Sequence, residues 1–555
     1  MTKQSFYKQK LLSRSAMIFL LSGAIGFNAN AQRDTTKKQS IDITSSYKPV
    51  LRNAVKINFS GSQLAADTSR PVLAYTIPAQ NLFYAYQPIS LKPLALEADT
   101  NLYLGGRHYI KAGFGSYSTP YVKAGLSFGD GRTSLFNLTG KYIGSKGDIK
   151  NQDYSQMNVT AAGSYFGKKN EVYAGASYSQ DNYYLYGYDH AVYDFKRDEI
   201  RQQFQDITIT GGAKNSVKTG TGISYNPNLE LNFFTNKNKI SETTIKVNLP
   251  VEKIINENIT AQLEAKGDFS HYSTTGIIAN NTKFSNNLIS VSPAILYHAP
   301  RVYFTGGISP TWNNGKWEFL PNVHAEAQLQ ENVFMLQAGW VGRFTKNTYR
   351  NLTTANPYLL RADTQLNTKE IEYYGGLKAT LGKHFNVNAK AGWVSFDQFP
   401  IFINDTATDS KGFLVKHEPT MNSLRVHGDI SYINQDKFTL NAGITFNGYT
   451  GMNVNRKAWN TLPMEATASL RWFAFKHLLI KSDLWLFGGG NAITKGNSSR
   501  GFSGGTDLSA GAEYKINKQF SAWLDVNNIL NDKYERWHNY QVYGLNLVGG
   551  ILIHF

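Results

Sequence analysis

A tyrosine-rich segment, DNYYLYGYDHAVYDF at 181–195, carries the side chains of this chain that could best bind a ligand. The faces of aromatic rings stack on sugars and peptides, and a tyrosine also offers a hydroxyl for hydrogen bonding. Aromatic residues gather equally at membrane interfaces, and we favour that simpler interpretation of the segment. The candidate ligand-binding residues are Tyr183, Tyr184, Tyr186, Tyr188 and Tyr193.

Residue patterns typical of enzymes are missing from the sequence. The 11 histidines are scattered without metal-ligand spacing, and neither a phosphate-binding loop nor a G-x-S-x-G motif occurs. Asp429 and Glu465 could form an acidic pair, but isolated carboxylates are expected wherever a polar lumen is lined. With 0 cysteines, disulfides and thiol catalysis are excluded. We therefore expect no enzyme activity, no metal site and no cofactor.

An export signal is indicated by the first 31 residues. Lys3, Lys8, Lys10 and Arg14 precede an apolar run from Ala16 to about Phe27, and Ala29-Asn30-Ala31 follows as an A-x-A cleavage site. The run is too short to cross a bilayer of ~30 Å as a helix, which argues against a membrane anchor. We expect a signal peptide at 1–31, cleaved between Ala31 and Gln32.

The charge of the chain is strongly basic at +17, and removing the four basic signal residues leaves +13 on the mature chain. An exported protein does not meet nucleic acid, so that partner is not expected. Lipid phosphates, lipopolysaccharide or acidic glycans at a cell surface are more plausible partners. Solvated loop and turn residues would give the same balance.

Residues 32–104 form a proline-rich stretch, with five of the 16 prolines of the chain. Prolines at this density interrupt strand pairing and favour extended backbone. We expect an N-terminal arm or partial plug on the periplasmic side, and not an independently packed domain.

From 105 to 555 the sequence alternates apolar and polar residues, as in Phe438, Leu440, Ala442, Ile444 and Phe446. Many alternating segments reach 10 residues, whereas strands of soluble sandwiches average ~5 to 6. Tight turns, such as 129–132, 167–170, 382–384, 434–437 and 516–518, alternate with longer loops near 181–200, 346–370, 398–418, 488–505 and 529–541. The pattern predicts an all-β fold, a transmembrane antiparallel β-barrel of about 22 strands.

The last segment, YGLNLVGGILIHF at 543–555, is two-faced up to its final residue, with Tyr543 and the following odd-numbered residues on one face. A terminal aromatic residue behind alternating apolar residues resembles the signal read by the barrel assembly machinery. The residues expected to carry that signal are Leu547, Gly549, Ile551, Ile553 and Phe555.

The stretch DVNNILNDKYERWHNYQVYGLNLVGGILIHF at 525–555 resembles the last hairpin of TonB-dependent receptor barrels, in which an Asn-rich segment precedes a glycine-containing strand that ends in Phe. This resemblance implies an outer-membrane location in a Gram-negative bacterium and a barrel of 22 strands with an obstructed lumen. The 73 residues at 32–104 are fewer than the plug domain of that family requires, so the resemblance concerns the barrel part.

The function expected from these features is transport or capture of a ligand at the outer membrane. The alternative is a porin-like barrel without a complete plug that serves in a secretion or envelope assembly complex, with a periplasmic or surface protein as partner. We expect the arm at 32–104 to obstruct the periplasmic mouth, and the loops near 346–370 and 398–418 to close the outer side.

Overall fold

The computed structural model describes residues 108–275, 282–330, 333–382, 384–406, 409–434, 437–494 and 498–555. The expected signal peptide, its cleavage site at Ala31 and Gln32, and the arm at 32–104 lie outside the described residues. Within the described ranges, no helix has the length and apolar character needed to cross a membrane.

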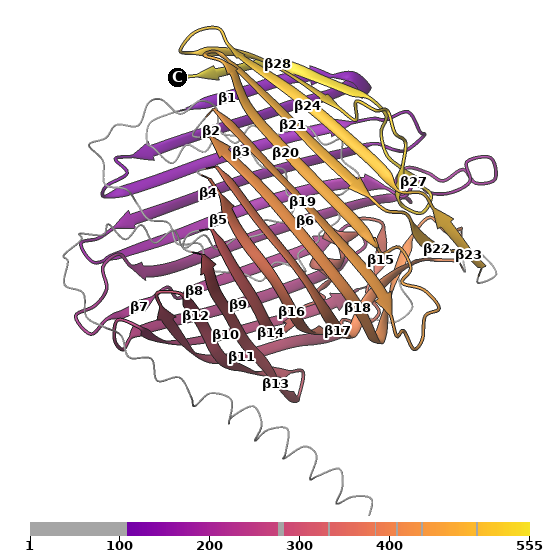
Figure 1. The fold of residues 1–555 in the computed structure, drawn as a ribbon. Helices are drawn as coiled ribbons and strands as arrows, with labels where there is room; N and C mark the ends of the chain where they lie inside the picture. The colour runs from indigo at the N-terminus through magenta and orange to yellow at the C-terminus, as the bar shows by residue number, and fades with distance from the viewer. Residues whose placement is uncertain are drawn as a thin grey trace, which may run out of the picture. The chain divides into compact units, whose positions relative to one another are not determined.

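The wall of the molecule is a closed antiparallel barrel of 22 strands, which confirms the fold predicted from the sequence. Each wall strand pairs with the next wall strand along the chain, and the ring closes where β1 pairs with β28, from Tyr109 opposite His554 to Gly115 opposite Val548 (Figure 1). The wall strands are β1 (Tyr109–Gly115), β2 (Thr119–Gly129), β3 (Ser134–Ser145), β4 (Tyr154–Phe166), β5 (Asn170–Tyr184), β6 (Arg201–Asn215), β8 (Asn228–Asn236), β9 (Ile240–Ile254), β10 (Ile259–Thr274), β11 (Lys283–Ala299), β12 (Val302–Asn313), β13 (Lys316–Gln330), β14 (Phe334–Thr345), β16 (Thr368–Leu381), β17 (Phe385–Asn404), β18 (Phe413–Asn434), β19 (Phe438–Thr450), β20 (Met464–Phe475), β21 (Leu478–Phe487), β24 (Gly505–Lys515), β25 (Phe520–Asn527) and β28 (Asn546–His554).

The remaining elements belong to connections between wall strands. β7 (Ile223–Tyr225) pairs with residues 251–253 of β9, next to the segment 241–248 of β9 that pairs with β8. β15 (Leu359–Arg361) pairs in parallel with β18. The others are η2 (Ser116–Ser118), α2 (Tyr349–Ala355), and the small hairpins formed by β22 (Gly490–Thr494) with β23 (Ser498–Phe502) and by β26 (Glu535–Trp537) with β27 (Tyr540–Gln541).

Alternation along each strand places apolar side chains outside the barrel and mostly polar ones inside. In β28 the outward-facing Leu547 and Ile551 are exposed, whereas the inward-facing Val548 and Leu552 are buried. Tyr543 departs from the expected face and is buried among the loops. Its position is explained by the start of β28 at Asn546, because strand alternation does not extend to a residue in the preceding loop.

The two ends of the barrel differ in the length of their connections, as the sequence predicted. We call the end at which His108 and Phe555 exchange backbone hydrogen bonds the turn end, and the opposite end the loop end. The connections 130–133 and 167–169 lie at the turn end, and 185–200 and 528–545 lie at the loop end. The loop expected at 398–418 is shorter, because β17 extends to Asn404 and β18 begins at Phe413.

Candidate functional site

The loop at 346–367, which joins β14 to β16, folds into the loop end of the barrel and carries the short helix α2. Thr348 caps the helix, since its side chain accepts a hydrogen bond from the backbone amide of Asn351 at 3.1 Å. Tyr349, Leu352 and Thr353 of α2 are buried. The helix is therefore an internal element and not part of a solvated loop.

Glu242 of β9 holds the start of α2. Its carboxylate accepts hydrogen bonds from the backbone amides of Tyr349 at 2.7 Å and Arg350 at 3.1 Å, and from the side-chain amide of Gln365 at 2.8 Å. The first amides of a helix have no partner within the helix, and a negative charge near them is favourable. Because Glu242 is only 1% exposed, these bonds are shielded from water.

Further polar contacts attach the same loop to the neighbouring wall strands. Arg350 forms an ion pair with Asp206 of β6, and Lys346 forms one with Asp268 of β10. The side-chain amide of Asn236 in β8 donates to the hydroxyl of Tyr349 at 2.8 Å. Burial lowers the pKa of Lys346, and the charge of Asp268 opposes that shift. The loop thus crosses from β14 to strands that lie several positions away in the ring.

A second loop, 528–545, leaves the barrel between β25 and β28 and also packs inward. Trp537 is buried against Phe402 and Phe413, with ring centroids 5.1 Å and 5.5 Å away. The guanidinium of Arg536 donates to the carbonyl of Asn460 at 3.0 Å. This loop therefore reaches the ends of β17 and β18 and the loop that precedes β20.

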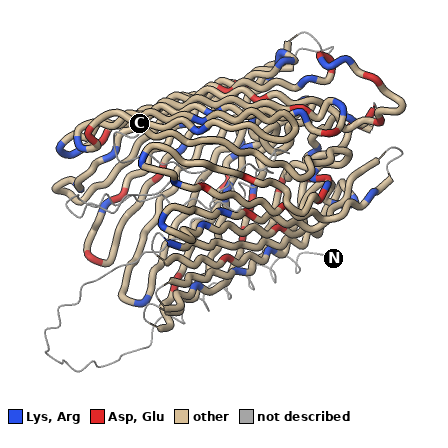
Figure 2. Tube along the Cα trace, turned by 90° about the horizontal axis from the view of Figure 1, so that it is seen from above, with Lys and Arg blue, Asp and Glu red and all other residues tan. Residues whose placement is uncertain are grey.

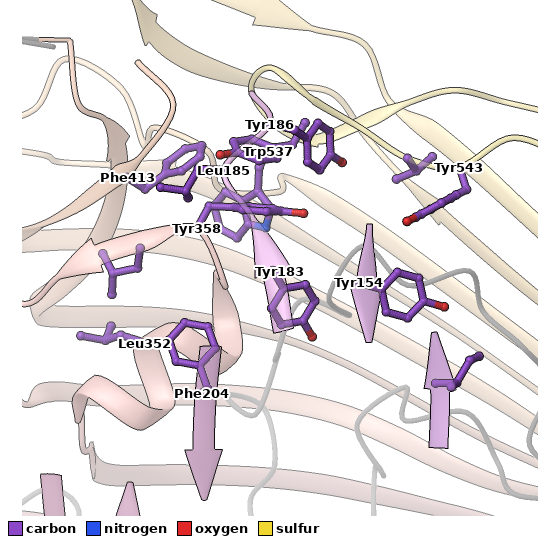
Figure 3. Close-up of a cluster of buried hydrophobic side chains, with 14 of the residues drawn as sticks. Tyr154, Tyr183, Leu185, Tyr186, Phe204, Leu352, Tyr358, Phe413, Trp537 and Tyr543 are labelled. Carbon is purple, nitrogen blue, oxygen red and sulfur yellow. The ribbon is translucent and has the colours of Figure 1, made fainter. Parts of the chain in front are cut away.

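The two loops meet through stacked tyrosines. The rings of Tyr358 and Tyr540 lie 3.5 Å apart between centroids at an angle of 22°, and the ring of Tyr186 packs edge-on against Tyr540 at 4.8 Å. Tyr186 also packs edge-on against Tyr358, at 6.0 Å between ring centroids (Figure 3). The hydroxyl of Tyr186 donates to the carbonyl of Gln541 at 2.9 Å. Burial raises the pKa of Tyr358 and Tyr540 well above the ordinary value. Three loops thus share one hydrophobic core.

That core continues into inward-facing side chains at the loop ends of the wall strands, including Tyr154, Phe204, Phe234 and Tyr272. Its members range along the sequence from Tyr109 in β1 to Leu552 in β28, and they include Tyr272 of β10. A 22-stranded barrel encloses a lumen too wide for wall side chains alone to fill. The packed loops provide the missing material at the loop end.

A cavity of about 240 Å³ lies beside α2. Phe204 and Phe234 contribute two stacked rings, 5.8 Å apart at 15°. The other lining residues are polar: Ser179, Asp181, Asp206, Arg350, Asn351 and Thr354. Carboxylates, hydroxyls and an amide next to aromatic rings suit a small hydrogen-bonding molecule.

The lumen wall carries buried charges elsewhere as well. Arg425 of β18 is 2.7 Å from the carboxylate of Glu370, which also pairs with Arg343. Lys111 of β1 lies 3.9 Å from Asp525 and 4.0 Å from the ring centroid of Trp523. In the described part of the chain, no group of three or more His, Asp or Glu residues is arranged to hold a metal ion.

Three solved structures of similar architecture are distant from this chain in sequence. The FrpB iron transporter from Neisseria meningitidis matches with a TM-score of 0.63 and 11% identity, over 81% of each chain. The siderophore receptor PirA from Acinetobacter baumannii gives 0.61 and 10%, also over 81% of each chain. The copper transporter OprC gives 0.60 and 11%, over 81% of this chain and 83% of that one.

The barrel has the fold of TonB-dependent receptors. This fold confirms the resemblance to TonB-dependent receptor barrels that the sequence of the last hairpin indicated. No protein-family model and no curated protein sequence matches the chain.

The five tyrosines that the sequence indicates as candidate ligand-binding residues fall into two groups according to their burial. Tyr183, Tyr186 and Tyr188 are buried in the shared core, so their rings contact other loop residues. Tyr184 and Tyr193 are partly buried at its edge, and the guanidinium of Arg197 lies 4.4 Å from the ring of Tyr184. Ligand contact by any of the five remains a prediction.

The other residues of interest from the sequence lie on the wall. Leu547, Gly549, Ile551 and Ile553 lie along β28, and Phe555 follows it at the turn end; their role as an assembly signal remains a prediction. Asp429 and Glu465 are on β18 and β20 and have different partners: Asp429 is 3.0 Å from His427, and Glu465 accepts from the indole of Trp485 at 2.7 Å.

Sequence reasoning missed the residues that fix α2. Glu242, Asp206 and Asp268 occupy polar positions of alternating strands, like other lumen-facing residues, and no local signal marks them as helix partners. The sequence TYRN at 348–351 does begin with a residue that favours helix caps, and this is the one signal that could have indicated α2.

Proposed function

We propose that the protein lies in the outer membrane of a Gram-negative bacterium and admits a ligand through a lumen that its own loops keep closed. The observation that carries the proposal is the attachment of α2 to Glu242. A helix inserted into the mouth of a barrel and fixed by a few polar contacts blocks passage, yet can be released when those contacts are exchanged. A loop with purely structural duty at the rim would not need to enter the lumen.

The ligand suggested by the cavity beside α2 is small, polar and rich in hydrogen-bonding groups. The similar solved structures include an iron transporter, a siderophore receptor and a copper transporter, and they support passage of a small ligand through this fold. Arg350 lines the cavity and also pairs with Asp206. A ligand that competes for either side chain would therefore weaken the attachment of α2 while it binds.

The experiment measures the uptake of small polar solutes by protein in which the loops are chemically linked and by protein in which they are not. The chain has 0 cysteines, so Tyr358→Cys with Tyr540→Cys introduces a unique pair for a short bis-maleimide linker. Linking the loops should lower uptake of small polar solutes into proteoliposomes, and each single-cysteine variant treated with the same reagent serves as the control. Equal uptake in the linked and single-cysteine proteins would contradict the proposal. A stable protein partner in detergent extracts, together with unchanged uptake, would instead favour the assembly role.

A further inference from the structure

The turn end of the barrel carries an excess of exposed basic side chains. In the described residues of its connections there are two acidic residues, Asp130 and Glu257, against eight basic ones. The basic residues are Arg132, Lys168, Lys169, Lys218, Arg301, Lys437, Lys476 and Lys518, and all eight are exposed. Residues outside the described part that fall between the same strands add one base, Lys383, and two acids, Glu331 and Asp436, which leaves the balance basic.

The eight basic side chains do not pair with the carboxylates that the structure describes. In the part of the chain that the structure describes, none of them forms an ion pair with a carboxylate. Asp130 is engaged locally instead, since its carboxylate accepts from the backbone amides of Arg132 at 2.9 Å, Thr133 at 2.7 Å and Ser134 at 3.1 Å. These hydrogen bonds hold the pKa of Asp130 well below its usual range.

The loop end differs in this respect. Several of its basic residues form ion pairs within the loops, among them Lys150 with Asp194, Arg197 with Asp153 and Arg361 with Asp363. Lys237 pairs with Asp198 in the same way. Among the described residues, basic charge is thus partly compensated by ion pairs at the loop end and not at the turn end. Figure 2 shows Lys and Arg at hairpin tips on the side where the C-terminus is marked.

Aromatic residues fix the depth of these charges relative to a membrane. Outward-facing rings are common in the last residues of the strands at the turn end, as with Tyr165, Phe475 and Tyr514, which are 59%, 73% and 54% exposed. Such rings settle at the level of the lipid headgroups. Lys168 and Lys169 follow Tyr165 closely, Lys476 follows Phe475 directly, and Lys518 lies between Tyr514 and Phe520. In a membrane, these ammonium groups would therefore lie at the level of the lipid phosphates.

We propose that this basic rim binds the phosphate groups of anionic glycerophospholipids in the membrane leaflet at the turn end. A cation beside an anionic headgroup gains favourable energy that falls off within a Debye length, and several cations around one rim act together. The rim then holds a ring of anionic lipid around the turn end and fixes the height of the barrel in the bilayer. This inference does not depend on the ligand or on the closure of the lumen.

The test uses the whole protein in nanodiscs made from phosphatidylethanolamine and phosphatidylglycerol at three to one. The lipid that remains bound after extraction into mild detergent is measured by native mass spectrometry. The rim variant combines Lys168→Gln, Lys169→Gln, Lys476→Gln and Lys518→Gln. The matched control removes four charges at the loop end through Lys150→Gln, Arg197→Gln, Lys237→Gln and Arg361→Gln.

We expect the unchanged protein and the loop-end control to enrich phosphatidylglycerol roughly threefold or more over the input, and the rim variant to show almost none. High salt should abolish the enrichment in the unchanged protein. A second variant with arginine at the same four rim positions keeps the charge and should keep the enrichment. Undiminished enrichment in the rim variant would overturn the proposal, and so would binding of soluble polyglutamate to the rim without any lipid preference.

Discussion

The carboxylate of Glu242 accepts a 2.7 Å hydrogen bond from the backbone amide of Tyr349, although 107 residues separate them in the sequence. Glu242 belongs to the barrel wall, and Tyr349 is the first residue of α2 inside the barrel mouth. This contact links the barrel wall to the loop that, in the proposed function, closes the lumen, and it is the basis of the first prediction.

Replacing Glu242 by Ala should loosen α2 while the barrel remains folded. The two helix amides would lose a charged acceptor in a buried place. Each buried amide that is left without an acceptor costs about 1–3 kcal/mol. The effect can be measured as maleimide labelling of Leu352→Cys, a buried position in a chain that has 0 cysteines of its own. Labelling should become several-fold faster in the Glu242→Ala background.

The control for that measurement is Glu264→Gln, because Glu264 lies on the neighbouring strand β10 and pairs with Lys266 away from α2. This substitution should leave labelling of Leu352→Cys unchanged. Equal labelling rates in the Glu242→Ala and Glu264→Gln backgrounds would show that Glu242 does not hold the helix.

The stacked rings of Tyr358 and Tyr540 should stabilise the two loops jointly. Aromatic pairs contribute about 0.5–1.5 kcal/mol beyond the burial of their area, so a double-mutant cycle with Tyr358→Ala and Tyr540→Ala should give a coupling energy of that size. Limited proteolysis of the loops at 346–367 and 528–545 provides the readout, since cleavage reports the population of opened loops. Strictly additive effects of the two substitutions would contradict a shared core.

Closure of the barrel between β1 and β28 should depend on the absence of a side chain at Gly550. A Cβ at this position would collide with the carbonyl oxygen of Ala112 on the adjacent strand. Gly550→Ala should therefore reduce the amount of heat-modifiable, folded barrel. Gly140→Ala on β3 is the matched control, because a Cβ there meets nothing within 4 Å and the folded amount should be normal. Similar yields from both variants would mean that the seam tolerates a wider spacing.

Deletion of Phe555 should also lower the amount of folded barrel. Its backbone exchanges hydrogen bonds with His108, at 3.0 Å and 3.2 Å, and its ring lies 5.6 Å from the imidazole. The deletion removes these contacts together with the aromatic residue expected to be read during assembly, without placing a charge on the lipid face as an Ile551→Asp change would. Normal levels of heat-modifiable barrel after the deletion would show that Phe555 is not needed as a signal for barrel assembly.

The wall could be predicted from the sequence because its physical requirements are local. Lipid outside and a polar lumen inside impose a period of two on every strand, and tight turns such as that at Asp130 carry their own hydrogen-bonding residues. The mouth could not be predicted in this way. Whether Tyr186 meets a ligand or Tyr540 is decided by how two loops far apart in the sequence pack together. The predicted face of Tyr543 is wrong because β28 begins three residues later, at Asn546.

The closed mouth is tested most directly by single-channel conductance in planar bilayers, measured on protein from which residues 36–100 have been removed. If the arm obstructs the periplasmic mouth, as the sequence predicts, its removal should raise conductance above that of the full chain. Conductance should still stay well below that of an open 22-stranded lumen, because the loops remain as an obstruction. In that background, Glu242→Ala should add larger and more frequent openings, since the helix that blocks the loop end is released. If the arm-deleted protein is already fully open and Glu242→Ala adds nothing, the loops do not close the lumen.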